Sequence, residues 1–208
     1  MKVYSLIGSR GVGSVGELTL QKWKDKTVAR TKPVSVENPQ TEAQQTHRQK
    51  FSLLVAASRT LAAVITIGFK QISNSMTTFN SFVKYNIASA ITGTYPNFSI
   101  EYEFLQLSRG SALPLTDVAV AVGLSGLYRV TWDQPAGSPV PADSMLYLVA
   151  LNPATGDLLY FASAPMDNTV IEFPGSADVA ANSSLFKYVF YVNSANGATS
   201  DSVWFDAF

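Results

Sequence analysis

The spacing of apolar residues changes once along this chain, near residue 97, and this change constrains the fold more than any other feature. Between residues 41 and 96 apolar side chains recur every three or four positions, which is typical of amphipathic helices. From Phe98 onward they alternate with polar side chains, and clusters of Gly, Pro, Asn and Asp interrupt the pattern about every ten residues. The chain is therefore predicted to be an α+β protein in which helices precede an all-β region.

A helix is predicted to begin at Thr41, the N-cap of a capping-box pattern that Gln44 completes, with Glu42 at the positive helix start. Its apolar face comprises Phe51, Leu54, Val55, Ser58, Leu61, Ala62 and Ile65, and Gly68 is expected to end it. A second apolar face comprises Phe79, Phe82, Val83, Ile87, Ala90 and Ile91, before Gly93 and Pro96. Residues 37–96 are thus expected to form a two-helix hairpin.

Residues 97–208 are expected to form an antiparallel β-sandwich of the immunoglobulin-like kind. The candidate strands are 98–107, 118–122, 127–132, 145–151, 158–163, 169–173, 185–192 and 202–206. This number of short strands in about 110 residues fits such a sandwich, and Trp132 is a natural core residue. Without cysteines, however, the disulfide pattern of true immunoglobulin domains is absent.

Residues 1–36 are rich in glycine and in basic residues and are predicted to form an extended arm or β-hairpin. Such a hairpin has little apolar surface to bury and would be marginal in water unless something covers it. Two alternatives stay open: an arm that adds to a neighbour's surface, and a hairpin packed on its own chain. The candidate assembly contacts are Lys22, Trp23, Lys24, Lys26, Arg30, Lys32 and, at the predicted helix, Arg48.

The formal net charge of zero is a cancellation between the two halves of the chain. Residues 1–96 hold twelve Lys/Arg and four Asp/Glu, a net charge of +8, whereas residues 97–208 hold three and eleven, a net charge of −8. This asymmetry predicts an acidic partner for the basic half, such as the C-terminal half of a neighbouring copy. Nucleic acid is the competing partner, but no recognised module surrounds the basic residues and the acidic half would repel a polyanion.

Several kinds of site are disfavoured by composition. The chain has no cysteine and a single histidine, His47, which excludes thiolate chemistry and His-based metal clusters and argues against a catalytic triad. We interpret Glu101 and Glu103 as part of a solvated strand face and the loop aspartates as turn residues. A divalent-cation site at two or three of these aspartates is the lesser alternative. We therefore expect no enzyme activity, no cofactor and no metal.

No segment has the apolar core of a signal peptide, and Leu53 to Phe69 is too short and too polar to span a membrane. We therefore expect neither an export signal nor a membrane partner.

A resemblance adds to this interpretation. Its residues are Gly13 to Gly16, Trp23, Val28 to Arg30, Asn38 to Gln45, Arg48, Phe51, Met76, Phe79, Asn80, Asn86, Ala90, Ile91 and Gly93 to Pro96. They resemble an uncharacterised domain-of-unknown-function family common in Bacteroidota and their phages. The Asn-Pro-x-Thr-x-x-Gln segment at residues 38–44 also resembles a motif of tailed-phage structural proteins. The resemblance implies a structural role and brings no catalytic residues.

Together these features predict a structural subunit of a phage virion, in the head, connector or tail, made in the host cytoplasm. It would bind copies of itself, as a homo-oligomer, and other virion proteins, through its arm and its charge-complementary halves. The alternative is a β-sandwich binding module at an extracellular surface, for a surface glycan or a host protein. Its contact residues would be tyrosines such as Tyr95, Tyr102, Tyr147 and Tyr160.

Overall fold

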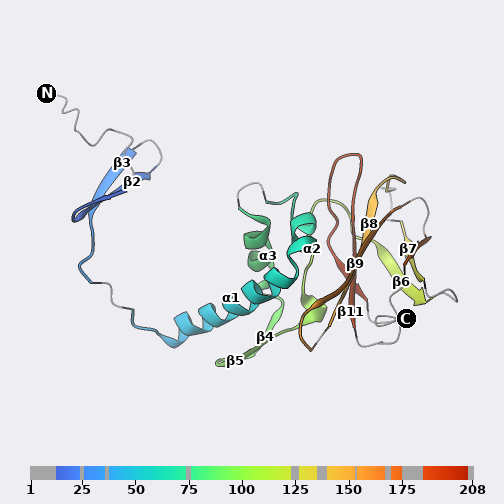
Figure 1. The fold of residues 1–208 in the computed structure, drawn as a ribbon, viewed down its shortest axis with the longest axis horizontal. Coiled ribbons are helices and arrows are strands. Elements are labelled where there is room, and N and C mark those ends of the chain that lie inside the picture. Colours follow the sequence, from blue (N-terminus) through green and yellow to red (C-terminus); the bar gives the residue numbers. More distant parts are fainter. Residues whose placement is uncertain are drawn as a thin grey trace. The chain divides into compact units, whose positions relative to one another are not determined.

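The computed structural model of this protein describes residues 13–23, 26–35, 38–73, 76–122, 127–134, 140–152, 154–166, 170–174 and 185–205. The chain divides into two compact units, Met1–Thr41 and Glu42–Phe208. Helices and antiparallel strands are both present, so the predicted α+β class is confirmed (Figure 1).

The first unit contains a three-stranded antiparallel sheet. Its strands, in the order β1-β2-β3, are β1 (Gly13–Val15), β2 (Leu18–Trp23) and β3 (Lys26–Thr31). Gly16, at a φ of 58°, occupies the turn between β1 and β2, a left-handed conformation that glycine adopts at little cost. Within the described part of the arm, the predicted β-hairpin is therefore present as β2 and β3, and β1 pairs with β2 as a third strand.

The second unit begins with α1 (Glu42–Thr60), which starts directly after Thr41 as predicted, followed by α2 (Ala62–Gly68) and α3 (Thr78–Asn86). The expected continuous helix to Gly68 is wrong, because the axis bends by 94° at Leu61. Just before the bend, the hydroxyls of Ser58 and Thr60 donate to carbonyls three residues back, each at 2.8 Å, and such bonds often bend helices. No single described helix is long and apolar enough to cross a membrane; only α1 and α2 taken together pass that test.

The expected second helix also ends early, at Asn86, and residues beyond it form a hairpin. This hairpin pairs β4 (Ile91–Thr94) with β5 (Asn97–Ile100), and the short 3-10 helix η1 (Tyr102–Phe104) follows. The predicted strand 98–107 is therefore shorter than expected. Gly93 has a φ of 97°, and a Cβ there would overlap the carbonyl oxygen of Asn97, so the hairpin requires glycine at this position.

In the part of the chain that the structure describes, seven further strands build two antiparallel sheets. They are β6 (Thr116–Val122), β7 (Tyr128–Asp133), β8 (Met145–Leu151), β9 (Leu158–Pro165), β10 (Val170–Phe173), β11 (Phe186–Val192) and β12 (Val203–Phe205). The strand orders are β10-β7-β6 in one sheet and β12-β11-β8-β9 in the other. Most of these strands begin and end within about two residues of the predicted bounds, because turn residues mark their ends.

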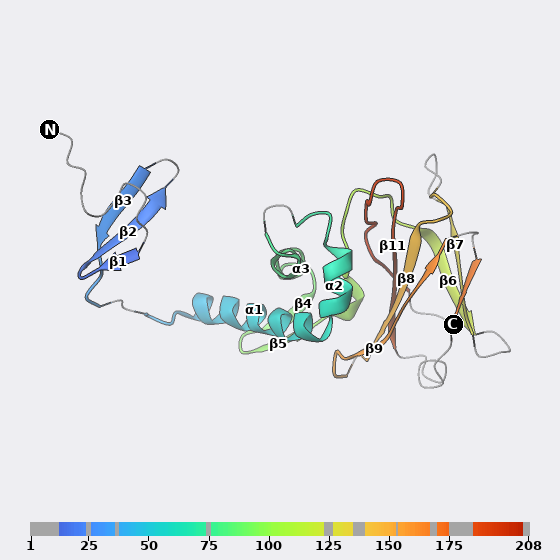
Figure 2. The same cartoon turned by 45° about the horizontal axis from the view of Figure 1, so that its top comes forward.

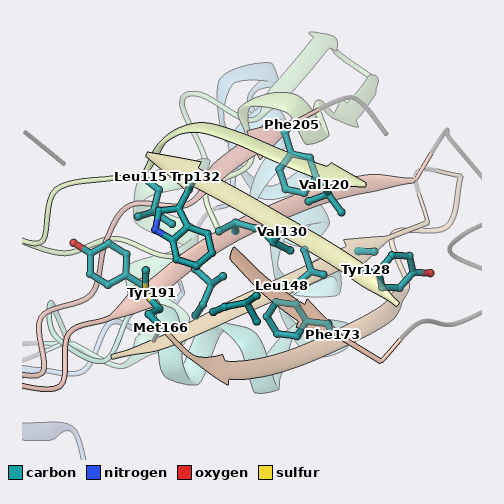
Figure 3. Packing of buried hydrophobic residues seen from close by; sticks show 14 of the residues in the cluster. Leu115, Val120, Tyr128, Val130, Trp132, Leu148, Met166, Phe173, Tyr191 and Phe205 are labelled. Carbon is teal, nitrogen blue, oxygen red and sulfur yellow. The ribbon is translucent and has the colours of Figure 1, made fainter. Parts of the chain in front are cut away.

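One hydrophobic cluster lies between the two sheets. Figure 3 shows the Trp132 indole of β7 among Leu115, Met166 and Tyr191, with Leu148 of β8 nearby. Trp132 is 2% exposed, which confirms its predicted place in the core.

A second hydrophobic cluster covers the opposite face of the four-stranded sheet. It joins Leu54 of α1, Phe69 directly after α2 and Phe82 of α3 to Val149 of β8 and Phe190 of β11. Figure 2 shows the helices on one side of β8 and β11 and strands β6 and β7 on the other. Strands β8 and β11 are therefore buried on both faces, which explains their almost uninterrupted apolar sequences.

Candidate interaction surface

The sheet of the first unit has hardly any core of its own. Among the residues of β1 to β3 and their turns whose burial is described, none is buried, and only Thr19 and Leu20 are half-buried. Leu18 and Val28 are 45% and 47% exposed. A sheet of this size is marginal in water unless another surface covers it. The described residues of this sheet therefore bury little apolar surface within the first unit.

The strand register distributes the side chains over two faces. Leu18 and Leu20 lie opposite Thr31 and Ala29, so these four positions share one face. Lys22 occupies the same face as the two leucines, two residues further along β2. This face combines apolar residues with a cation.

The opposite face carries Thr19 opposite Arg30, and the register position of Lys26 lies on this side as well. Lys26 and Arg30 thus share one face, whereas Lys22 falls on the other, because the chain reverses between Lys22 and Lys26.

The predicted assembly contacts fall into three groups. Lys22, Arg30 and Lys32 are exposed in the first unit, and the backbones of Trp23 and Lys26 pair with each other across β2 and β3. Lys24 lies outside the described residues, as do the side chains of Trp23 and Lys26. Arg48 is exposed on α1, in the other compact unit. The structure thus gathers the basic strand residues on one small sheet and separates Arg48 from them by unit.

The two compact units carry opposite net charges. Residues 1–41 hold seven Lys/Arg and three Asp/Glu, a net charge of +4, whereas residues 42–208 hold eight and twelve, a net charge of −4. Within the second unit, residues 42–96 keep a net charge of +4, so its negative charge belongs to residues 97–208. Residues 97–208, which we call the strand-rich part, therefore carry the negative charge of the second unit.

The expected pair of carboxylates on a strand face is not present. The strand ends at Ile100, so Glu101 precedes η1 and Glu103 lies within it. Of the loop aspartates, Asp143 accepts a hydrogen bond from the Ser194 hydroxyl, and Asp201 accepts one from the Gly110 amide at 3.1 Å. Among the described residues there is no group of three or more His, Asp or Glu side chains that could hold a metal ion.

Two shallow grooves flank α1, and neither was predicted from the sequence. One of about 410 Å³ is lined by residues of α1, by Phe98 and Ile100 of β5, and by Tyr102. The other, of about 280 Å³, lies between α1 and α3, with His47, Phe51 and Lys84 in its wall. The His47 side chain is exposed there.

The tyrosines that could serve a binding module are half-buried and engaged within the chain. The Tyr95 hydroxyl donates to Gln45 Oε1, and the Tyr160 hydroxyl donates to the carbonyl oxygen of Pro174. The Tyr147 ring stacks between two phenylalanine rings, with centroids 5.9 and 5.0 Å away. Burial raises the pKa of Tyr102, and the nearby Asp157 raises it further.

Comparison with known families assigns the chain to one family. The family described as "Family of unknown function (DUF6266)" matches residues 9–201. The chain belongs to this family. The matched range covers residues 9–41 of the first unit and 42–201 of the second, so the exposed sheet and most of the larger unit are parts of one family architecture. No curated protein matches the chain.

Proposed function

We propose that this member of the family is a non-enzymatic assembly subunit whose first unit binds a neighbouring copy of the same chain. One observation carries the proposal: the sheet of β1 to β3 is formed without any described residue being buried. A sheet that keeps its shape with so little core is stabilised by what it contacts. A second copy supplies such a surface at the concentration of the protein itself.

Charge complementarity supports the same partner. The first unit has a net charge of +4 and the second of −4, so head-to-tail contacts between copies bring opposite charges together. Nucleic acid would meet the acidic strand-rich part as well as the basic sheet, which disfavours it.

The finer assignment is a phage virion protein in the head, connector or tail. It rests on the resemblance of residues 38–44 to a motif of tailed-phage structural proteins, and this segment leads directly into α1. The same assignment includes a Bacteroidota or phage origin, synthesis in the host cytoplasm, and other virion proteins as further partners.

We also propose that β6 to β12 form an immunoglobulin-like sandwich. If β6 to β12 are lettered A to G in chain order, the strand orders are E-B-A in one sheet and G-F-C-D in the other. The fourth strand, D, therefore pairs with C, whereas in the constant-type immunoglobulin sandwich it lies beside E.

Removing the first unit tests the proposal. Native mass by light scattering, at low salt, is measured for the full chain and for residues 42–208, which hold both hydrophobic clusters. The full chain is expected to assemble, and the truncated protein to be a folded monomer by circular dichroism. A truncated protein that forms the same oligomer, or a full chain that stays monomeric, overturns the proposal; the latter result favours the binding-module alternative.

A matched pair of charge reversals separates the arm from charge in general. Arg30→Glu with Lys32→Glu changes the arm, while Arg59→Glu with Lys70→Glu makes the same change in charge at exposed sites of α1 and the end of α2. The first pair is expected to abolish assembly and the second to preserve it. Equal loss from both would contradict a role for the arm.

A further inference from the structure

The two large sheets have four edge strands, and β9 differs from the other three. In β6 a register irregularity between Thr116 and Ala119 and the charged Asp117 interrupt the edge. Strand β10 has four residues and includes Glu172, which pairs with Arg129 at 2.9 Å, and β12 has three residues. Natural sheets protect free edges by such bulges, charges and short lengths.

Strand β9 is the longest of these edges and carries no charged residue. It spans eight residues, Leu158–Pro165, with an irregularity near Leu158 and a proline at its end. Between these, residues 160–164 pair regularly with β8 on one side. On the other side no described strand pairs with them. The Tyr160 hydroxyl donates to the Pro174 carbonyl and β10 lies close to β9, but β10 forms its described backbone pairing with β7 and not with β9.

The first unit presents an edge strand of similar length. Strand β3 ends the order β1-β2-β3 and spans six residues, or about 20 Å at the usual rise per residue. Its sequence, Lys-Thr-Val-Ala-Arg-Thr, contains three β-branched residues. It can therefore cover the regular stretch of β9.

The charges at the two edges are complementary. Asp157 directly precedes β9, and Asp143 lies near the other end, because Met145 pairs with Pro165. Both carboxylates are in exposed residues. In contrast, β3 carries Lys26 and Arg30 and is followed by Lys32, in a segment without a carboxylate.

We propose that the free edge of β9 accepts strand β3 of a second copy, which extends the four-stranded sheet by strand addition. The inference rests on the proposed function and names its docking site. Pairing β9 with the β9 of another copy is the competing arrangement. It would bring the acidic ends of two antiparallel β9 strands together, whereas β3 brings cations to them.

Disulfide cross-linking tests the contact between β3 and β9. Only the introduced cysteines can react, because the chain has no cysteine of its own. Full-length Ser163→Cys, on β9, is mixed under mild oxidation with full-length Val28→Cys or Ala29→Cys, which sample the two faces of β3. A disulfide-linked dimer is expected from at least one mixture. The control replaces Ser163→Cys by Ala119→Cys, an exposed site on the β6 edge, and is expected to give none.

A pair of substitutions at one position tests the role of charge. Ser163→Lys places a cation where β3 brings cations, and is expected to raise the dissociation constant of assembly about tenfold or more. Ser163→Glu is expected to leave assembly within about threefold of wild type.

The outcomes separate this inference from the proposed function. A wild-type chain that is monomeric at low salt overturns both. A wild-type chain that assembles, while Ser163→Lys assembles equally well and no β3–β9 cross-link forms, overturns the β9 site alone. Efficient cross-linking of Ser163→Cys to itself establishes pairing between β9 strands and also overturns it.

Discussion

Asn86, the last residue of α3, connects this helix to the chain that follows η1. Its side chain is fully buried. Nδ2 donates to the carbonyl oxygens of Phe82 and Gln106, each at 2.9 Å, and Oδ1 accepts from the Gln106 amide at 2.7 Å. One side-chain amide thus satisfies both backbone groups of Gln106, as a neighbouring strand would do.

Replacing Asn86 by alanine is expected to lower the free energy of unfolding by about 2–3 kcal/mol, because buried backbone groups lose their partners. Urea denaturation followed by circular dichroism measures the change. Asn80→Ala, at an exposed position of the same helix, is the control and is expected to stay within about 0.5 kcal/mol of wild type. Equal effects at both positions would contradict the role given to Asn86.

Tyr188 makes stability depend on alkaline pH. Its hydroxyl is buried and donates to the carbonyl oxygen of Tyr102, and burial raises its pKa well above the usual 10. Above pH 10 the unfolded chain loses this proton while the folded chain retains it, so stability is complete below pH 10 and decreases as pH rises.

The Tyr188→Phe variant is expected to lose less stability per pH unit above pH 10 than the wild type, by up to about 1.4 kcal/mol per unit. Denaturation at a series of pH values from 8 to 11 measures this slope. The variant should be less stable than the wild type at pH 8, where only the lost hydrogen bond counts. An unchanged slope would show that Tyr188 does not couple to pH.

At the scale of elements, Gln71, which lies three residues after α2, connects the end of this helix to loops of the strand-rich part through hydrogen bonds. Its Oε1 accepts from the amides of Ser111 and Thr199, at 2.9 and 3.1 Å, and its Nε2 donates to the Ser111 hydroxyl at 2.6 Å. Arg109 reinforces the same junction through its amide, which donates to the Gly68 carbonyl at 3.0 Å. A Cβ on Gly68 would overlap the Leu107 carbonyl oxygen, so the helix end and this loop are in direct contact.

Gln71→Ala leaves two backbone amides without their acceptor and is expected to destabilise the protein by about 1–3 kcal/mol. Lys70→Ala, one residue earlier and exposed, should change stability by less than about 0.5 kcal/mol. Hydrogen exchange of the Ser111 and Thr199 amides provides a local readout, and both are expected to exchange faster in Gln71→Ala. Unchanged exchange would show that Gln71 is not their acceptor in solution.

The sequence allowed strands to be predicted more accurately than helices, for a physical reason. Turn residues mark strand ends locally, whereas the bend at Leu61 leaves the three-four spacing intact because α1 and α2 both face one hydrophobic cluster. The hairpin of β4 and β5 was missed because Ile91, part of a helical spacing, packs against that same cluster from a strand.

The candidate surface was predictable only in part. The basic residues of the first unit were identified from composition, but their division between two faces depends on where the chain turns after Trp23. The free edge of β9 depends on which strands pair, and no local pattern in residues 158–165 encodes that.

At the scale of the whole molecule, a net charge of zero conceals units of +4 and −4. In the proposed assembly, attraction between copies through these units is screened by salt over a Debye length of about 10 Å at 0.1 M and about 3 Å at 1 M. The hydrophobic clusters that hold Glu42–Phe208 together are not screened in this way. Salt should therefore act on assembly and leave folding intact.

Native mass measured by light scattering is expected to fall from oligomer to monomer as sodium chloride rises from 0.05 to 1 M, while near-ultraviolet circular dichroism stays unchanged. Negative-stain images of the same fractions should show a ring, tube or filament only at low salt. The charge-reversed arm, Arg30→Glu with Lys32→Glu, should be monomeric throughout, because it lacks the attraction that salt removes. An oligomer that persists unchanged at 1 M salt would show that apolar contacts, and not opposite charges, hold the copies together.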